Sequence, residues 1–141
     1  MAGFSRVKGG DKGFEEVAIS SITVAVGDAL MWDYENEVVI LGTSSMTIEN
    51  FAGVAVAAAT TSDTTVLIQK PEEFDEYIVD TTSNSATTDN YHRNALTDED
   101  AVANGADVTG DTGVFQQLAP VGAAADKKIR GRFVTRQDRA A

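Results

Sequence analysis

The feature that most constrains the fold is a succession of short apolar runs of period two, each closed by turn-forming residues. Six such runs lie in the first half of the chain: 22–26, 30–34, 38–41, 46–48, 51–59 and 66–68. Apolar side chains at alternate positions indicate half-buried strands. Short strands at intervals of about 8–12 residues are typical of sandwiches and small barrels. The sequence therefore predicts an all-β fold, a small sandwich or barrel of short antiparallel strands.

The first 16 residues differ from this pattern. They contain four glycines and two isolated apolar side chains ahead of residue 14, Phe4 and Val7. Glycine-rich segments without periodicity indicate irregular backbone. We therefore interpret residues 1–16 as an extended N-terminal arm and residues 17–141 as a single β domain.

A second departure is the polar stretch from residue 81 to residue 112, rich in Thr, Asn, Asp and Ala. We interpret it as a long loop inserted into the β domain, because loops of this length are usually functional or disordered. One short helix is predicted within it, with Thr97 as the N-cap, acidic residues in the first turn and Gly105 at the end. A strand at 129–134 is expected to follow, with Arg130 and Arg132 on its polar face.

The charge is distributed unevenly along the chain. The net charge is −11, from 22 acidic and 11 basic residues. Between residues 17 and 125 only Lys70 and Arg93 are basic, whereas residues 126–139 carry six basic side chains. An acidic body repels nucleic acid and anionic membranes, so neither is expected as a partner. The basic end is expected to pair with an acidic surface of a neighbouring subunit.

Motifs for catalysis and cofactor binding are weak. The chain has one histidine, His92, no cysteine and no G-x-S-x-G element. The acidic runs at 72–76 and 98–100 lack the spacing of calcium loops, so we interpret them as exposed acidic surface. We expect no enzyme activity, no catalytic or metal-binding residue and no cofactor. Trp32 is expected either in the core or at an interface.

Three stretches of the sequence resemble the head decoration (cement) proteins of tailed bacteriophages. The first joins residues 22–30 (ITVAVGDAL) to residues 51–59 (FAGVAVAAA). The others are residues 77–98 (YIVDTTSNSATTDNYHRNALTD) and 120–134 (PVGAAADKKIRGRFV), and together the three cover about half of the chain.

This resemblance implies a β-rich structural protein, often a homotrimer, that binds the outside of a capsid of the HK97-type fold and stabilises it. Its partners would be the major capsid protein and further copies of itself. It would be made in the host cytoplasm and located on the outer surface of the virion. The implied contact residues are Phe4, Arg6 and Phe14 in the arm, and Arg130, Arg132 and Arg136 toward an acidic partner surface.

Two alternatives stay open. Another virion component, such as a tail-associated β-protein, would share this composition and differ in its partner. A free-standing ligand-binding β module would be a monomer with a defined pocket and exposed aromatic side chains. No apolar run approaches the ~18 residues of a membrane span, so a soluble protein is expected.

Overall fold

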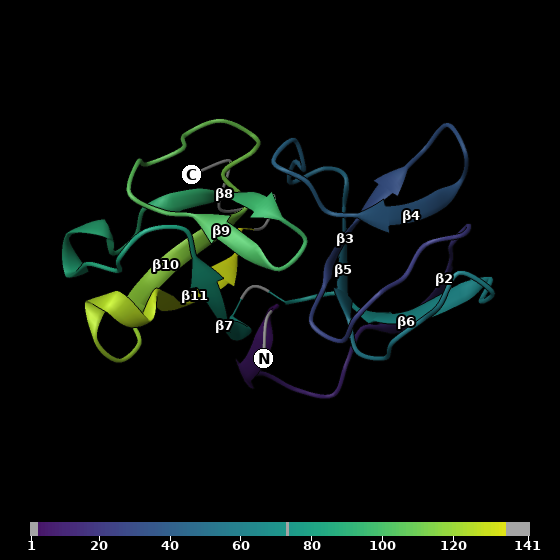
Figure 1. Ribbon diagram of the computed structural model, residues 1–141, viewed down its shortest axis with the longest axis horizontal. Helices are drawn as coiled ribbons and strands as arrows, with labels where there is room; N and C mark the ends of the chain where they lie inside the picture. Colours follow the sequence, from purple (N-terminus) through teal and green to yellow (C-terminus); the bar gives the residue numbers. More distant parts are fainter. Residues whose placement is uncertain (1–2, 73, 135–141) are drawn as a thin grey trace.

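The computed structural model describes residues 3–72 and 74–134, and it confirms the all-β fold. Its regular structure consists of strands and two short 3-10 helices, η1 (Thr87–Asp89) and η2 (Ala124–Asp126). The strands form two sheets, seen to the left and right in Figure 1. Neither helix within these ranges has the length and apolar character that crossing a bilayer requires.

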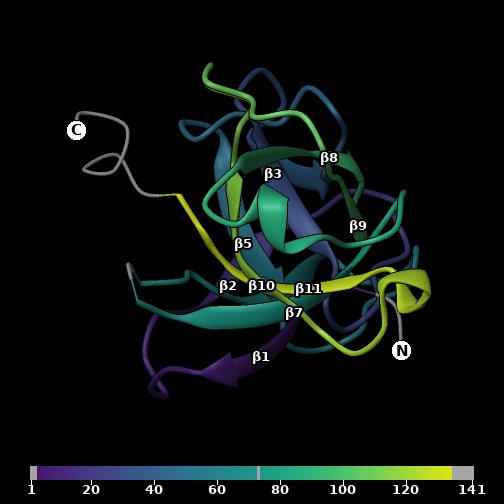
Figure 2. The same ribbon diagram turned by 90° about the vertical axis from the view of Figure 1, so that its left-hand side faces the viewer.

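The first sheet closes into a small barrel. Its strands follow the order β1 (Ser5–Lys8), β7 (Glu76–Thr81), β11 (Lys128–Phe133), β10 (Phe115–Pro120), β8 (Arg93–Asp98) and β9 (Ala101–Ala103). The end of β7 also pairs in parallel with β9, which closes β7, β11, β10, β8 and β9 into a ring. Strand β1 pairs with the beginning of β7, on the side of β7 that faces away from β11 (Figure 2).

Side chains at every second position of the strands point inward and fill the barrel. Along β11, Ile129, Gly131 and Phe133 are buried, and the arginines between them point outward as predicted. The aromatic rings of Tyr77 and Phe115 join Phe133 in the core. Inward positions of small barrels are filled by side chains, so this interior is a packed core.

The second sheet has the order β2 (Phe14–Ala18), β6 (Thr65–Gln69), β5 (Phe51–Ala55), β3 (Ala29–Asp33) and β4 (Val38–Leu41). Strands β3 and β4 form the predicted hairpin, with its turn at residues 34–37. Strand β3 is buried on both faces: Ala29 and Met31 contact the barrel core, and Leu30 contacts the core of the second sheet. The two cores are therefore separated by a single strand layer.

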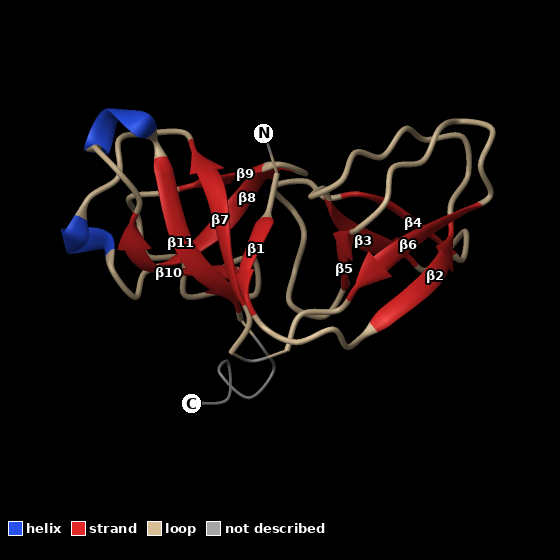
Figure 3. Cartoon of the chain, turned by 90° about the horizontal axis from the view of Figure 1, so that it is seen from below, coloured by secondary structure: helices blue, strands red, loops and turns tan. Residues whose placement is uncertain are grey.

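One antiparallel ribbon joins the two sheets. Strand β1 pairs with β7 in the barrel, and β2 pairs with β6 in the second sheet. Most residue pairs in β1–β7 and in β2–β6 follow one continuous antiparallel register, in which Ser5 pairs with Ile78 and Ala18 pairs with Thr65. We call residues 5–18 and 65–78 together the bent ribbon (Figure 3).

Hydrogen bonds between the two strands hold the bend. The amide nitrogen of Lys70 donates to the carbonyl of Gly13 at 3.0 Å. The side-chain nitrogen of Gln69 donates to the carbonyls of Gly10 and Lys12 at 3.2 and 2.7 Å. Gly13 has φ = +77°, and a Cβ there would lie 2.8 Å from the Lys70 carbonyl oxygen. The bend therefore requires glycine at this position.

The prediction of an N-terminal arm outside the fold is wrong from Gly3 onward. Phe4 is 3% exposed and lies in the barrel core, and the next residues form two paired strands. The glycines that suggested irregular structure include those of the bend. The partner strand lies about 60 residues further along the chain, so no local pattern reveals the pairing.

Four other predictions are corrected. The helix starting at Thr97 is wrong, because β8 and β9 form a hairpin within the stretch 81–112. The run 22–26 provides only an isolated bridge from Val24 to Ala59, and residues 46–48 lie outside the strands. Asp75, expected in an exposed acidic turn, is only 5% exposed. Asp75 is buried because it pairs with Arg6, 69 positions away in the sequence, which no local pattern reveals.

Candidate interaction surfaces

The predicted arm contacts have different environments. Phe4 is buried in the barrel core, so it is not available for a contact in this fold. The Arg6 guanidinium pairs with the buried carboxylate of Asp75 at 3.2 Å. Phe14 is 49% exposed at the start of β2, and its contact role stays a prediction.

The basic strand β11 lies on the outer face of the barrel, where acidic residues of β7 partly neutralise it. Arg130 pairs with Glu76, and Lys128 pairs with Asp80. Burial alone would raise the pKa of Glu76, but the hydrogen bonds and charges of Arg130 and Lys8 outweigh it and lower this pKa. Arg136 lies outside the described residues.

Arg132 borders a shallow hollow on this outer face. The hollow has a volume of about 380 Å³ and is lined by Lys8, Phe74, Glu76, Tyr91, Gln116, Leu118 and Arg132. We call it the barrel-face hollow. Phe74 and Tyr91 are each 69% exposed. Two side-chain hydrogen bonds order its floor, from Arg132 Nε to Gln116 Oε1 at 3.0 Å and from Gln116 Nε2 to the Tyr91 carbonyl at 3.1 Å.

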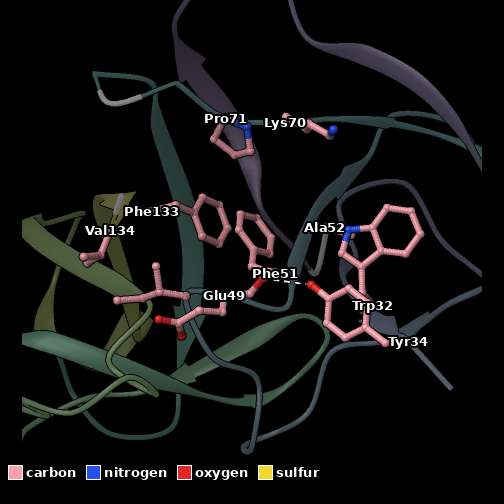
Figure 4. Close-up of a pocket in the computed structure, with 10 residues that line it drawn as sticks. Trp32, Tyr34, Glu49, Phe51, Ala52, Lys70, Pro71, Phe133 and Val134 are labelled. Carbon is pink, nitrogen blue, oxygen red and sulfur yellow. Dashed lines mark hydrogen bonds between the residues drawn. The ribbon is translucent and has the colours of Figure 1, made fainter. Parts of the chain in front are cut away.

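A second concave surface lies where the second sheet meets the end of β11, and we call it the junction groove (Figure 4). It has a volume of about 350 Å³ and is lined by Trp32, Tyr34, Ile48, Glu49, Phe51, Ala52, Lys70, Pro71, Phe133 and Val134. The rings of Phe51 and Phe133 stack with centroids 4.4 Å apart. The Tyr34 hydroxyl donates to the backbone carbonyl of Glu49 at 3.1 Å, yet Tyr34 remains 66% exposed.

An acidic cluster lies where the β8–β9 turn meets the second sheet. The carbonyl of Glu99 accepts a 2.8 Å hydrogen bond from the amide of Ala29. A hydrogen bond with Asp98, then burial and nearby negative charges, raises the pKa of Asp100 to about 6. Burial is also the main cause that raises the pKa of Asp28. Within residues 3–72 and 74–134, no group of three or more acidic, His or Cys side chains is arranged to hold a metal ion.

The single histidine connects two loops. His92 Nδ1 lies 3.2 Å from the carbonyl oxygen of Gly105 and 3.5 Å from an Asp89 carboxylate oxygen. His92 itself lies outside the regular elements, immediately before β8.

Three exposed aromatic residues of these surfaces were not predicted as contacts: Phe74, Tyr91 and Tyr34. Tyr34, which the sequence pattern assigned to the strand 30–34, lies in the hairpin turn. Phe74 and Tyr91 are single aromatic residues among polar neighbours. That isolation is the signal that could have identified them, because exposed aromatic side chains are enriched at interfaces. Trp32 packs against the second core and also lines the junction groove. Its role at an interface stays a prediction.

Comparisons of the chain with protein-family models, curated proteins and solved structures find no significant match.

Proposed function

We propose that this chain is a structural virion protein that binds the outside of a phage capsid lattice and stabilises it, as a decoration protein. It acts as a homotrimer on a shell of HK97-type capsid protein. The sequence resemblance supports the class. The observation that carries the contact surface is the barrel-face hollow, where Phe74 and Tyr91 extend into solvent beside Arg132.

The chemistry of this hollow fits a protein–protein contact. Aromatic residues and arginine carry most of the binding energy at interfaces, and a polar rim surrounds them. Here the polar rim includes the Glu76 carboxylate, which forms ion pairs with Lys8 and with Arg130. Phe74 and Tyr91 lie in the turns that precede β7 and β8, two strands of the closed barrel.

The expected strength of the contact follows from its size. Burying one large apolar side chain contributes roughly 1.5–3 kcal/mol, so Phe74 and Tyr91 contribute about 3–6 kcal/mol before the cost of association. A single copy would therefore bind a shell weakly. A trimer that makes three such contacts at once gains affinity through avidity, without requiring a deep pocket.

The test is co-sedimentation of the protein with undecorated capsid shells from its source virus, followed by imaging. We expect saturable binding at regular lattice positions and a three-chain mass by light scattering. Phe74→Ala and Tyr91→Ala should each weaken binding about ten-fold or more. The matched control is Tyr34→Ala, which removes an equally exposed ring from the other sheet. A monomer that never sediments with shells would contradict the proposal.

The junction groove favours a second candidate, a ligand-binding β module. Such a module has a concave site with exposed aromatic side chains, and this groove has Trp32, Tyr34 and Phe51 in its wall. A monomer that binds a soluble ligand and ignores shells would favour this candidate.

A further inference from the structure

Trp32 and Tyr34 separate two hollows. One is the junction groove, and the other is a hollow of about 380 Å³ lined by Trp32, Asp33, Tyr34 and Glu37. We call the two aromatic side chains the aromatic ridge. It belongs to the second sheet, and the proposed capsid contact on the barrel does not use it.

The ridge is held in place before any partner arrives. Trp32 pairs with Val39 across the β3–β4 hairpin and packs against the second core. Tyr34 is fixed at its far end by the hydrogen bond from its hydroxyl to Glu49. Asp33 accepts a 2.7 Å hydrogen bond from the side chain of Asn36. Prior ordering reduces the entropy that binding must overcome.

The electrostatics of the ridge favour a cation. The second hollow combines two aromatic side chains with the carboxylates of Asp33 and Glu37, and none of its four lining residues is basic. The Asp33 carboxylate is ionised at neutral pH, and the hydrogen bond from the Asn36 side chain lowers its pKa further. On the groove side, the Lys70 ammonium pairs with Glu15 at 2.7 Å.

We propose that the aromatic ridge binds an arginine side chain presented by an extended segment of a partner protein. The guanidinium stacks on the aromatic rings and pairs with the carboxylates of Asp33 and Glu37. Arginine fits better than lysine because its guanidinium is planar, weakly hydrated and able to stack while it donates hydrogen bonds. The negative charge beside the rings favours a cation over a neutral ligand such as a sugar.

The chain carries its own reporter for this site, because Trp32 is its only tryptophan. The probe is the peptide acetyl-Gly-Arg-Gly-Arg-Gly-amide, titrated into the full chain while tryptophan fluorescence is recorded. Two matched peptides replace both arginines of this probe, one by lysine and the other by citrulline. Citrulline is neutral but close to arginine in shape. We expect a saturable change with arginine, a weaker one with lysine and none with citrulline. Added salt should reduce the affinity.

Exposed side chains provide variants that leave the fold intact. Glu37→Gln and Tyr34→Ala should each weaken arginine-peptide binding roughly two- to five-fold. Tyr91→Ala removes a ring of similar exposure from the barrel face and should leave binding unchanged. Urea midpoints equal to that of the unmodified chain would confirm that each variant is folded.

The outcomes separate this proposal from the proposed function, because the titration uses no capsid shells. The proposal would be overturned if the citrulline peptide gave the same response as the arginine peptide. It would also be overturned if the arginine peptide showed no saturable binding. A saturable response to cellotriose without one to the arginine peptide would also overturn it and identify a sugar platform. None of these results bears on binding by Phe74 and Tyr91 at the barrel face.

Discussion

Replacing Phe4 by alanine tests whether the N-terminal segment belongs to the fold. The Phe4 ring is 3% exposed, and its centroid lies 4.8, 5.2 and 6.5 Å from those of Phe133, Phe115 and Tyr77. Truncating a buried phenylalanine to alanine costs about 3–5 kcal/mol, from lost burial and from the cavity left behind. A chain of this length has a free energy of unfolding of roughly 7–20 kcal/mol. The variant should therefore fold but lose a large part of its stability.

The matched control is Phe14→Ala, ten residues further along the same ribbon. Phe14 is 49% exposed, so its truncation should cost less than about 1 kcal/mol. Urea unfolding followed by Trp32 fluorescence and circular dichroism measures both variants. With a urea slope of about 2 kcal/mol per molar, the midpoint of Phe4→Ala should fall by roughly 2 M and that of Phe14→Ala by less than about 0.5 M.

Equal midpoints for the two variants would refute this reasoning. They would mean that the N-terminal residues do not pack in the barrel core and that the segment is the free arm first inferred from its glycines. Midpoints that agree between fluorescence and circular dichroism would support two-state unfolding, which the comparison of free energies requires.

Three further predictions follow from the barrel and its borders. Because the folded-state pKa of Asp100, about 6, lies above its ordinary value of 3.8, the folded chain binds the additional proton. This contribution to stability is fully present below about pH 4 and is lost as pH rises through about 6. Asp98→Asn should flatten that pH profile in urea melts. Glu76→Gln leaves Arg130 without its carboxylate and should cost about 1–2 kcal/mol by the same assay. Gly131→Ala would place a Cβ within 3.0 Å of neighbouring atoms inside the barrel and should cost about 1–3 kcal/mol, seen as a lower melting temperature.

Much of the second sheet could be predicted from the sequence, because its patterns are local. The β3–β4 hairpin places alternating side chains on either side of a polar turn, so one short window contains both strands and their connection. Strand β11 shows the same alternation, with Arg130 and Arg132 outward. These elements required no knowledge of distant residues.

The barrel closure and the bent ribbon could not be predicted in this way. Strand β9 has three residues and only Val102 is buried, too short a pattern to outweigh the polar residues around it. Strands β1 and β2 have few inward apolar side chains, and their partners lie far along the chain. The candidate surfaces were missed for a related reason: the hollows form only when separate strands and turns bring their aromatic residues together.

The bent ribbon also determines when the protein can finish folding. Its strand pairs join residues 47 to 73 positions apart, from Ala18 with Thr65 to Ser5 with Ile78. Closing such loops slows folding, since chain entropy is lost before the contacts form. During synthesis β1 emerges well before β7, and β11, the other neighbour of β7, emerges later still. Phe4 and β1 therefore stay exposed until these partner strands have been made, which gives the nascent protein a period of vulnerability to aggregation.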